Sequence, residues 1–326
     1  MNFNQFIQQA NQFGKQHIPF FFLIDFEQQK PILCPIESAV ENGIFFDFQG
    51  LKNFHTDSKV FTDKMTLQSF PISFNEYQQG FKLVKQQLQK GNSYLLNLTY
   101  PTEIKINGNL EQLFYLTQAP YKLWLKDQFL CFSPEPFIKI ENNQIFTYPM
   151  KGTINACIKN AKEKLLNNPK EQKEHYTIVD LMRNDLAIVA QNIQVKKFRY
   201  IDKIQTNRSS ILQTSSEIVG DLPINWQENI GTILSKLLPA GSISGAPKQK
   251  TVEIIKQAEK QNRGYYTGIF GIFNGNTLRS AVAIRFIEQQ KNKLYFHSGG
   301  GITSQSNAED EYQELLEKVY LPISEI

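Results

Sequence analysis

The sequence lacks several features that would identify a class of protein at once. It has only three cysteines, Cys34, Cys131 and Cys157, and no Cys-x-x-Cys pair. This pattern argues against a disulfide framework or a zinc site and indicates reduced thiols. No apolar run approaches the ~20 residues of a membrane-spanning helix, and the polar residues 1–16 are unlike a signal peptide. We therefore expect a cytoplasmic protein without a membrane partner.

An excess of charge of one sign is also lacking. The 326 residues carry a net charge of +4, and the lysines are scattered along the chain, so the sequence predicts no nucleic-acid partner. The composition, with 41% hydrophobic and 20% charged residues, is that of an ordinary globular protein. The length is sufficient for one large core or two lobes.

The hydrophobic patterns divide the chain at residue 73. Residues 1–72 contain no group of polar side chains that suggests chemistry, so we assign them a structural role and place the function in 73–326. Ser73 and Glu76 resemble a capping box that begins a helix. The expected helices span 1–16, 73–90, 110–118, 169–190, about 248–261 and a last one from about 306; the expected strands include 18–26, 43–48, 93–100, 121–141 and 145–148.

A single lysine stands at a predicted corner of the chain. Pro149 follows the strand-like run 145–148 and biases the preceding residue toward an extended conformation. Gly152, directly after Lys151, allows the backbone to turn sharply and to approach a ligand. Among apolar neighbours the Lys151 amine would lose hydration and its pKa would fall, which produces a nucleophile. From this segment alone, a solvated lysine in a β-turn is the alternative.

Three glutamates on two predicted helices are candidate metal ligands. Glu174 lies in line with the apolar stripe of helix 169–190, where a carboxylate needs a partner or a metal ion. Alternatively, Glu174 stays hydrated near the start of the helix, where the helix dipole stabilises its negative charge. Glu311, Glu314 and Lys318 share one face of the last helix. Together the carboxylates would suit an oxygen-coordinated Mg²⁺; exposed Glu–Lys ion pairs are the alternative.

The glycine-rich loop 237–248 is not a phosphate-binding P-loop. Ala246 and Pro247 occupy the positions where that motif requires its second glycine and its lysine. Pro247 lies close to the start of the following helix, whose free N–H groups would suit a carboxylate. The loop therefore predicts an anion site of another kind.

A hairpin is predicted near the end of the chain. Residues 266–273 and 277–288 flank the turn signal Asn274-Gly275-Asn276, and 294–297 should add a third strand. On the strand 277–288, Arg285 alternates with small apolar residues, which favours an anionic ligand. An edge position open to water is the alternative.

Five stretches, in this order, resemble the chorismate-utilising enzymes, which include anthranilate, aminodeoxychorismate, isochorismate and salicylate synthases. They are 239–248, Arg263-Gly264-Tyr265-Tyr266-Thr267-Gly268, Ala283-Ile284-Arg285, Gly299-Gly300-Gly301-Ile302 and 309–318. The resemblance covers about residues 74–320 and is more specific than any single motif. It implies an α+β fold of two large, mainly antiparallel sheets packed face to face, with helices on the outside. Residues 1–72 would be a reduced N-terminal segment of that fold and 73–326 the chorismate-binding catalytic domain.

The segment Pro149-Met150-Lys151-Gly152-Thr153 indicates the subgroup. It resembles the Pro-Ile-Lys-Gly-Thr of aminodeoxychorismate synthase component I, in its short form, whereas anthranilate synthases have alanine at the lysine. The Gly-Gly-Gly-Ile run, in place of Gly-Ala-Gly-Ile, points the same way. Anthranilate synthase component I, an isochorismate or salicylate synthase, and a non-catalytic chorismate-binding protein stay open as alternatives.

The resemblance implies a role for each candidate site residue. Lys151 would be the nucleophile, and Glu135, sixteen residues earlier (151 − 135), the general acid. Glu174 and Glu314 would bind Mg²⁺, with Glu311 acting through water, and Ser242 would add a hydroxyl contact. The implied substrate-binding residues are Gly152, Thr153, Tyr266, Arg285, Gly299, Gly300, Gly301 and Lys318.

The resemblance also implies the reaction. The Lys151 amine would attack ring carbon 2 of chorismate while Glu135 protonates the hydroxyl that leaves carbon 4. Ammonia would then add at carbon 4 and expel the lysine, which gives 4-amino-4-deoxychorismate for p-aminobenzoate and folate synthesis. Because no cysteine lies in the glycine-rich elbow of a glutaminase, we expect a separate glutamine amidotransferase subunit to supply the ammonia.

The sequence departs from the family pattern at several positions. Pro136 follows Glu135 where the family usually has arginine, Ile154 follows Thr153 where arginine is usual, and Gln213 replaces a frequent histidine. The Leu-Leu-Glu-Ser tryptophan-binding motif is missing from the sequence, which argues against feedback inhibition by tryptophan. These changes bear on rate and loop detail more than on the type of reaction.

Overall fold

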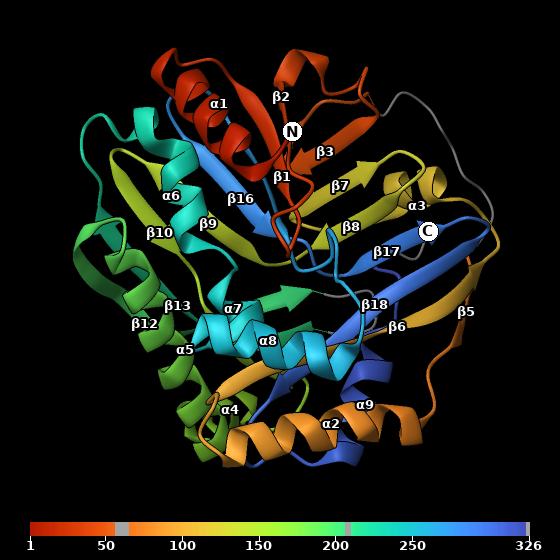
Figure 1. Cartoon of the computed structure of the whole chain (residues 1–326). Helices are drawn as coiled ribbons and strands as arrows, with labels where there is room; N and C mark the ends of the chain where they lie inside the picture. The colour runs from red at the N-terminus through yellow and green to blue at the C-terminus, as the bar shows by residue number, and fades with distance from the viewer. Residues whose placement is uncertain (56–64, 206–209, 324–326) are drawn as a thin grey trace.

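The structure is a computed structural model that describes residues 1–55, 65–205 and 210–323. Two large sheets form its centre and helices cover them (Figure 1). Among the described residues each sheet has nine strands, and all paired strands are antiparallel. The predicted α+β fold is therefore confirmed, and no helix of the described residues is long and apolar enough to cross a membrane.

The first sheet has the strand order β11-β13-β10-β9-β16-β15-β1-β2, with β12 paired to β13. Its strands are β1 (Phe20–Ile24), β2 (Ile32–Pro35), β9 (Pro136–Glu141), β10 (Gln144–Thr147), β11 (Met150–Asn155), β12 (Gln191–Gln205), β13 (Ser210–Asp221), β15 (Ile269–Phe273) and β16 (Leu278–Val282).

The second sheet has the order β14-β6-β18-β17-β8-β7-β3-β4, with β5 paired to β6. Its strands are β3 (Ile44–Phe48), β4 (Leu51–Lys52), β5 (Leu67–Phe70), β6 (Leu95–Ile106), β7 (Tyr121–Leu125), β8 (Phe129–Ser133), β14 (Gly245–Ala246), β17 (Phe286–Gln290) and β18 (Lys293–Ile302). Strands from residues 1–72 thus enter both sheets. The division of the chain into an N-terminal segment, 1–72, and a catalytic domain, 73–326, stays a prediction.

The expected helices form, whereas the helices at Ala161–Asn167, Ile230–Leu237 and Gly241–Ser244 were not predicted. Ser73 accepts a hydrogen bond from the Glu76 backbone N–H and begins α2, and Asn2 and Gln5 form a capping box at α1. The helices are α1 (Phe3–Lys15), α2 (Phe74–Gln89), α3 (Leu110–Leu116), α4 (Ala161–Asn167), α5 (Pro169–Ala187), α6 (Ile230–Leu237), α7 (Gly241–Ser244), α8 (Lys248–Glu259) and α9 (Ala308–Glu317), with short 3₁₀ turns at Ile36–Ser38 and Trp226–Asn229.

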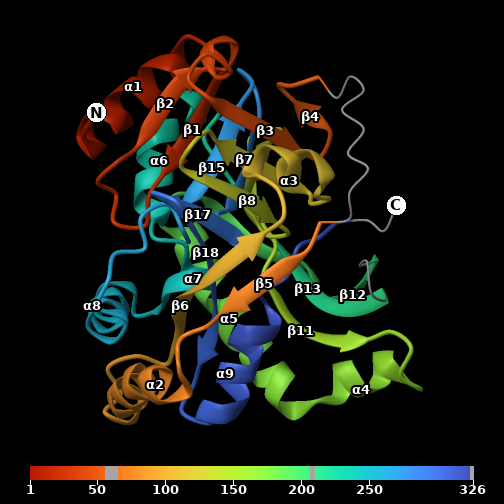
Figure 2. The same ribbon diagram turned by 90° about the vertical axis from the view of Figure 1, so that its right-hand side faces the viewer.

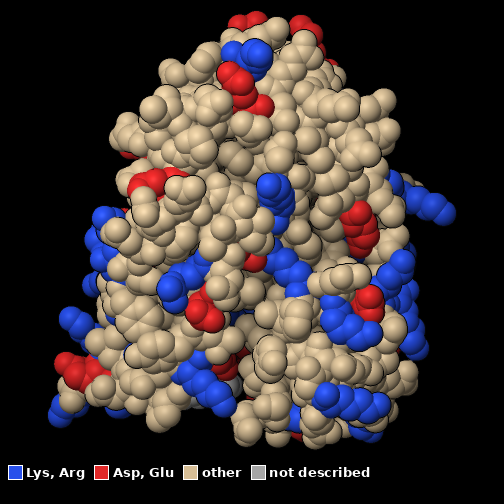
Figure 3. Space-filling view, turned by 60° about the vertical axis from the view of Figure 1, so that its left-hand side comes forward, with Lys and Arg blue, Asp and Glu red and all other residues tan. Residues whose placement is uncertain are grey.

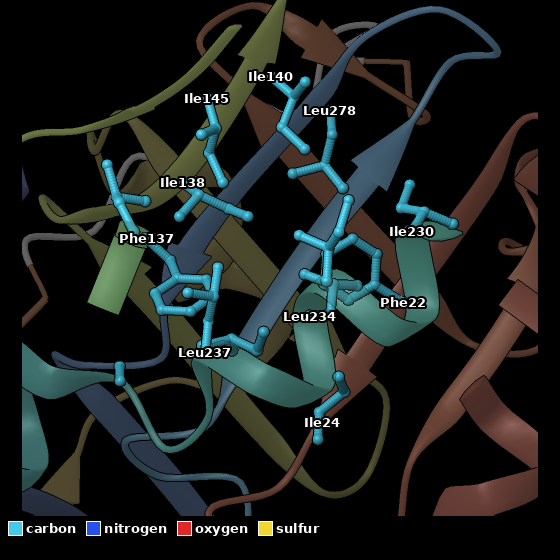
Figure 4. Packing of buried hydrophobic residues seen from close by; sticks show 14 of the residues in the cluster. Phe22, Ile24, Phe137, Ile138, Ile140, Ile145, Ile230, Leu234, Leu237 and Leu278 are labelled. Carbon is cyan, nitrogen blue, oxygen red and sulfur yellow. The ribbon is translucent and has the colours of Figure 1, made fainter. Parts of the chain in front are cut away.

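The two sheets pack face to face through alternating side chains of their strands. On β1, Phe21 and Leu23 point toward the second sheet and pack in one buried cluster with Phe46 and Leu123. Phe20, Phe22 and Ile24 point the opposite way, into a cluster that α1, α5 and α6 help to cover. Figure 4 shows three α6 residues of that cluster, Ile230, Leu234 and Leu237, against side chains of the first sheet.

Several helices cover the sheets at the two ends of the molecule. Helix α1 covers the first sheet at one end, and α2, α8 and α9 cover β6 and β18 at the other (Figures 1 and 2). On the face seen in Figure 3, positive and negative side chains are interspersed and lie mostly over the lower half of the view. This distribution agrees with the scattered lysines of the sequence.

The strand expected at 277–288 is wrong as a single element. The hairpin of β15 and β16 forms at Asn274-Gly275-Asn276 as predicted, but β16 ends at Val282 in the first sheet and β17 begins at Phe286 in the second. Between them Arg285 has a φ of 53°, a left-handed conformation that interrupts a strand. Arg285 therefore lies where the chain crosses between sheets, and not on a continuous strand face.

Two further elements differ from expectation. The strand expected to end at residue 297 continues as β18 to Ile302 and includes all three glycines of the Gly299–Gly301 run. The Lys151 corner is an irregularity inside β11, because the pairing with β13 shifts between Met150 and Thr153 and Gly152 has a φ of 86°. The backbone at Lys151 bends as predicted, but within a strand.

Candidate active site

A cavity of about 290 Å³ lies between β11, β18, α7 and the crossing from β16 to β17. All of the residues that the sequence assigned to catalysis or substrate binding line this cavity. They are Glu135, Lys151, Gly152, Thr153, Tyr266, Arg285, Gly299, Gly300, Gly301 and Lys318. Segments that are far apart in the sequence thus meet at one place, although their chemical roles stay predictions.

Lys151 is half-buried and its amine reaches the glycine strand. A Cβ atom added at Gly301 would lie 3.3 Å from the Lys151 Nζ atom, so the absence of a side chain at 301 leaves the space that the amine uses. The Lys151 carbonyl accepts a hydrogen bond from the Thr214 hydroxyl on β13. The backbone of Lys151 is therefore anchored to β13, and the residue lines the cavity.

Glu135 lies at the corner between β8 and β9 and lines the same cavity. The Ser242 hydroxyl, on α7, donates a hydrogen bond of 2.5 Å to Glu135 Oε1. Burial raises the pKa of Glu135, and the Ser242 hydrogen bond and the positive charge of Lys151 offset only part of that rise. The environment therefore favours the protonated acid, the form that can donate a proton.

Two further cations line the cavity. The Arg285 guanidinium lies over the Tyr320 ring, 5.5 Å from its centroid. Lys318 Nζ donates hydrogen bonds of 2.6 Å to Glu314 Oε1 and 2.7 Å to the Gly299 carbonyl. Burial lowers the pKa of Lys318, although Glu314 counteracts this. With Lys151, these residues give the cavity a positive character that suits a substrate carrying carboxylates.

The glycines of β18 allow other groups to approach the strand. β18 pairs with β6 from Leu294 to Ile302, whereas its pairing with β17 ends at His297. On that second edge the Gly299–Gly301 backbone has no strand partner among the described residues and borders the cavity. A Cβ at Gly299 would lie 2.2 Å from the Leu98 carbonyl oxygen, so a larger residue cannot replace it without backbone movement.

The predicted metal ligands form a pair and a separate third residue. A Cβ at Gly300 would lie 3.1 Å from Glu314 Oε1 and 3.2 Å from Glu311 Oε2, so these two carboxylates converge on one point beside the strand. Glu174 lines a neighbouring cavity with residues 303–305. Within the described part of the chain, no three acidic, histidine or cysteine side chains lie close enough to form a metal cluster. Carboxylate oxygens are the kind of ligand that Mg²⁺ prefers. The Glu174 side chain would have to move toward Glu311 and Glu314 to complete the predicted set.

Several residues at or behind the cavity were missed from the sequence. His297 lines it, with its ring 4.9 Å from that of Tyr266 and a hydrogen bond of 3.0 Å to Glu288. Asn97 lines it from β6, opposite Gly301. His297 could have been found from the sequence, because it alternates with Gly299 and Gly301. The position of Asn97 at the cavity depends on the register between β6 and β18, which the sequence does not reveal. Gln213, which replaces the family's histidine, also lines the cavity.

Comparison with known proteins shows which family this chain resembles. The profile described as chorismate binding enzyme matches residues 6–324. The chain belongs to the chorismate binding enzyme family. It is 67% identical over 318 residues to an uncharacterized PabA-like protein of Haemophilus influenzae, which covers 98% of this chain and 96% of the relative. The family prediction from the sequence is thereby confirmed.

Other members of the chorismate binding enzyme family are more distant. Aminodeoxychorismate synthase component 1 of Salmonella typhimurium is 32% identical over 259 residues, which are 75% of this chain and 56% of that protein; the chain thus matches little more than half of its length. The solved structure of the menaquinone-specific isochorismate synthase MenF of Escherichia coli has a TM-score of 0.74 at 16% identity and covers 97% of this chain and 80% of that one. This last likeness establishes the shared fold.

The raised pKa of Glu135 predicts a pH-dependent effect of Glu135→Gln on stability. Above the ordinary carboxyl pKa of ~4.3, Glu135 loses its proton in the unfolded chain but keeps it in the folded protein, where its pKa is raised. The free energy of unfolding therefore falls as pH rises from that ordinary value toward the folded pKa of Glu135. We expect the free energy of unfolding of Glu135→Gln, relative to the wild type, to increase between pH 4 and pH 8. Urea denaturation at several pH values measures it, and a difference that is constant with pH would contradict the assignment.

Proposed function

We propose that this protein is the chorismate-binding component of an aminodeoxychorismate synthase, which converts chorismate and ammonia to 4-amino-4-deoxychorismate. The observation that carries the proposal is the Lys151 amine inside the cavity, next to Gly301 and facing the same space as Glu135. The likeness to aminodeoxychorismate synthase component 1 over three quarters of the chain supports it.

The cavity offers groups for each part of chorismate. The Gly299–Gly301 backbone, Tyr266 and Arg285 would receive the enolpyruvyl carboxylate, because free N–H groups and a guanidinium bind carboxylates well. Gly152 and Thr153 would contact the ring from β11, and Lys318 would lie at the edge of the site. The positive charge of the cavity would also attract the dianionic substrate from solution.

Glu135 would supply the proton and Lys151 the nucleophile. Glu135, whose pKa burial raises, donates a proton to the hydroxyl on ring carbon 4, which leaves as water. The Lys151 amine, after release of its ammonium proton, forms a bond to ring carbon 2 as the double bond migrates. Ammonia then forms a bond to carbon 4, the double bond returns, and the bond from carbon 2 to Lys151 breaks. The new amine thus occupies the carbon that lost the hydroxyl.

A Mg²⁺ ion would be held by Glu311, Glu314 and Glu174, and when bound it would neutralise the ring carboxylate and draw electron density from the ring. The ion pair between Glu314 and Lys318 would have to loosen or rearrange so that the Glu314 carboxylate can bind the ion.

The ammonia source would be a partner glutamine amidotransferase. A glutaminase needs an activated cysteine, and the three cysteines of this chain do not offer one. Cys34 and Cys131 are buried, and burial raises the pKa of both thiols. Cys157 lies on the surface, and its backbone N–H bonds to the Asn155 side chain in a tight local turn.

Lys151→Ala should abolish formation of 4-amino-4-deoxychorismate, because it removes the amine that lies beside Gly301. The purified protein is supplied with chorismate, Mg²⁺ and an ammonium salt, and the products are identified by mass spectrometry. Lys236→Ala, which removes an exposed lysine on α6, is the matched control and should keep wild-type turnover. Unchanged turnover of Lys151→Ala would refute the mechanism, and anthranilate as the wild-type product would assign the protein to anthranilate synthase instead.

Removal of divalent metal tests the carboxylate pair. We expect treatment with a chelator to abolish turnover and added Mg²⁺ to restore it, whereas Glu314→Gln should raise the Mg²⁺ concentration required for half-maximal activity by about tenfold or more. Glu317→Gln, at an exposed position of the same helix, is the control. Full activity in the presence of chelator would show that the glutamates serve another purpose.

A further inference from the structure

A fully buried ion pair lies directly behind the cavity wall. Glu259, at the end of α8, and Arg263, four residues later, are joined by hydrogen bonds of 2.6 and 2.9 Å from the Arg263 Nη2 and Nε atoms to the two Glu259 oxygens. The Arg263 and Glu259 side chains are 2% and 0% exposed. Such a buried pair adds little net stability compared with apolar residues of the same shape, so stability alone does not account for it.

The ion pair holds β6 at the residues that face the cavity. Glu259 Oε1 accepts hydrogen bonds from the Thr99 backbone N–H at 2.8 Å and from the Thr99 hydroxyl at 2.9 Å. Arg263 Nη2 donates a hydrogen bond of 2.7 Å to the Asn97 carbonyl. Both Asn97 and Thr99 line the cavity, and they pair with Gly301 and Gly299 of β18. The position of the glycine strand is therefore coupled to the ion pair through β6.

The same arginine holds the turn that carries Tyr266. Arg263 Nη1 donates a hydrogen bond of 3.3 Å to the Thr267 hydroxyl. Thr267 has a φ of 59°, a left-handed conformation that is costly for a β-branched residue and persists only where its surroundings impose it. The Thr267 backbone N–H is fixed by the Ala283 carbonyl at 2.8 Å. Tyr266, buried and lining the cavity, directly precedes this strained residue.

We propose that Arg263 and Glu259 are positioning residues for the substrate carboxylate site: they fix the separation between the glycine strand, held through Asn97 and Thr99, and Tyr266, held through Thr267. The substrate's identity rests on the proposed function. The ion pair touches neither Lys151 nor Glu135 through any hydrogen bond of the described residues. Loosening it therefore affects substrate binding more than the chemical step.

Arg263→Lys tests this division. Lysine keeps the charge beside Glu259 but cannot donate at the same time to Asn97 and Thr267. We expect KM for chorismate to rise about tenfold, as for a lost hydrogen bond to a charged group, with kcat changed by less than about threefold. Glu253→Gln, which breaks the exposed ion pair of Lys250 and Glu253 on the same helix, is the control and should leave KM and the melting temperature unchanged. A lower melting temperature with unchanged KM would mean a purely structural role and would overturn the inference.

A second pair of variants keeps the inference testable if Arg263→Lys does not fold. Thr267→Val removes the hydroxyl that Arg263 holds and should raise KM, whereas Thr267→Ser retains the hydroxyl and should restore a KM near that of the wild type. In the double variant Arg263→Lys/Thr267→Val the increases in KM should not multiply, because both single changes break the connection between Arg263 and Thr267; multiplied effects would contradict the inference. If the wild type itself does not turn over chorismate, the proposed function fails, and the variants are then compared by their binding of chorismate in calorimetry.

Discussion

The close approach of the Lys151 amine to the backbone of Gly301 is the contact on which the account depends. At this place β18 has a residue without a side chain, β11 bends at Gly152, and the Thr214 hydroxyl anchors the Lys151 carbonyl. Each of these is a backbone condition, so the placement of the amine is decided by how the strands are built. A side chain at position 301 would crowd the amine, since its Cβ atom would lie 3.3 Å from the Lys151 Nζ atom.

The cavity exists because chain segments end, bend or cross at one place between the two sheets. β17 stops pairing with β18 before the glycines, which leaves a backbone edge facing the cavity. The crossing from β16 to β17 brings Arg285 to that edge in a left-handed conformation, and Thr267 adopts a similar one next to Tyr266. Strain of this kind is maintained where surrounding contacts impose it. The buried Glu259–Arg263 pair supplies such contacts at Thr267.

Much of this arrangement could be predicted from the sequence, for identifiable reasons. The Ser73 cap and the Asn274-Gly275 turn are local signals, and both structures form as expected. The residues of the family motifs line one cavity, because proteins with the same fold place corresponding residues at corresponding positions. The strand 277–288 was mispredicted because alternation looks the same whether a strand continues or changes sheets at Arg285. Similarly, glycines argue against a strand, yet Gly299–Gly301 form one, since close approach of other groups requires them.

The relations that the sequence could not supply are tertiary. Helical spacing correctly put Glu311 and Glu314 beside each other, but the distance from either one to Glu174 depends on how α5 and α9 pack, and Glu174 lines the adjacent cavity. The hydrogen bond from Ser242 to Glu135 joins residues 107 positions apart. No pattern of either segment predicts it, although both segments carried motifs.

The central claim is that the Lys151 amine bonds to the chorismate ring during turnover, and the bond can be sought directly. The protein is mixed with chorismate and Mg²⁺ without ammonia, quenched with acid, digested and examined by mass spectrometry. We expect the peptide containing Lys151 to gain the mass of chorismate less one water, and addition of ammonium salt before the quench to remove this species. An unmodified Lys151 peptide under conditions in which the same sample, given ammonia, forms 4-amino-4-deoxychorismate would contradict it.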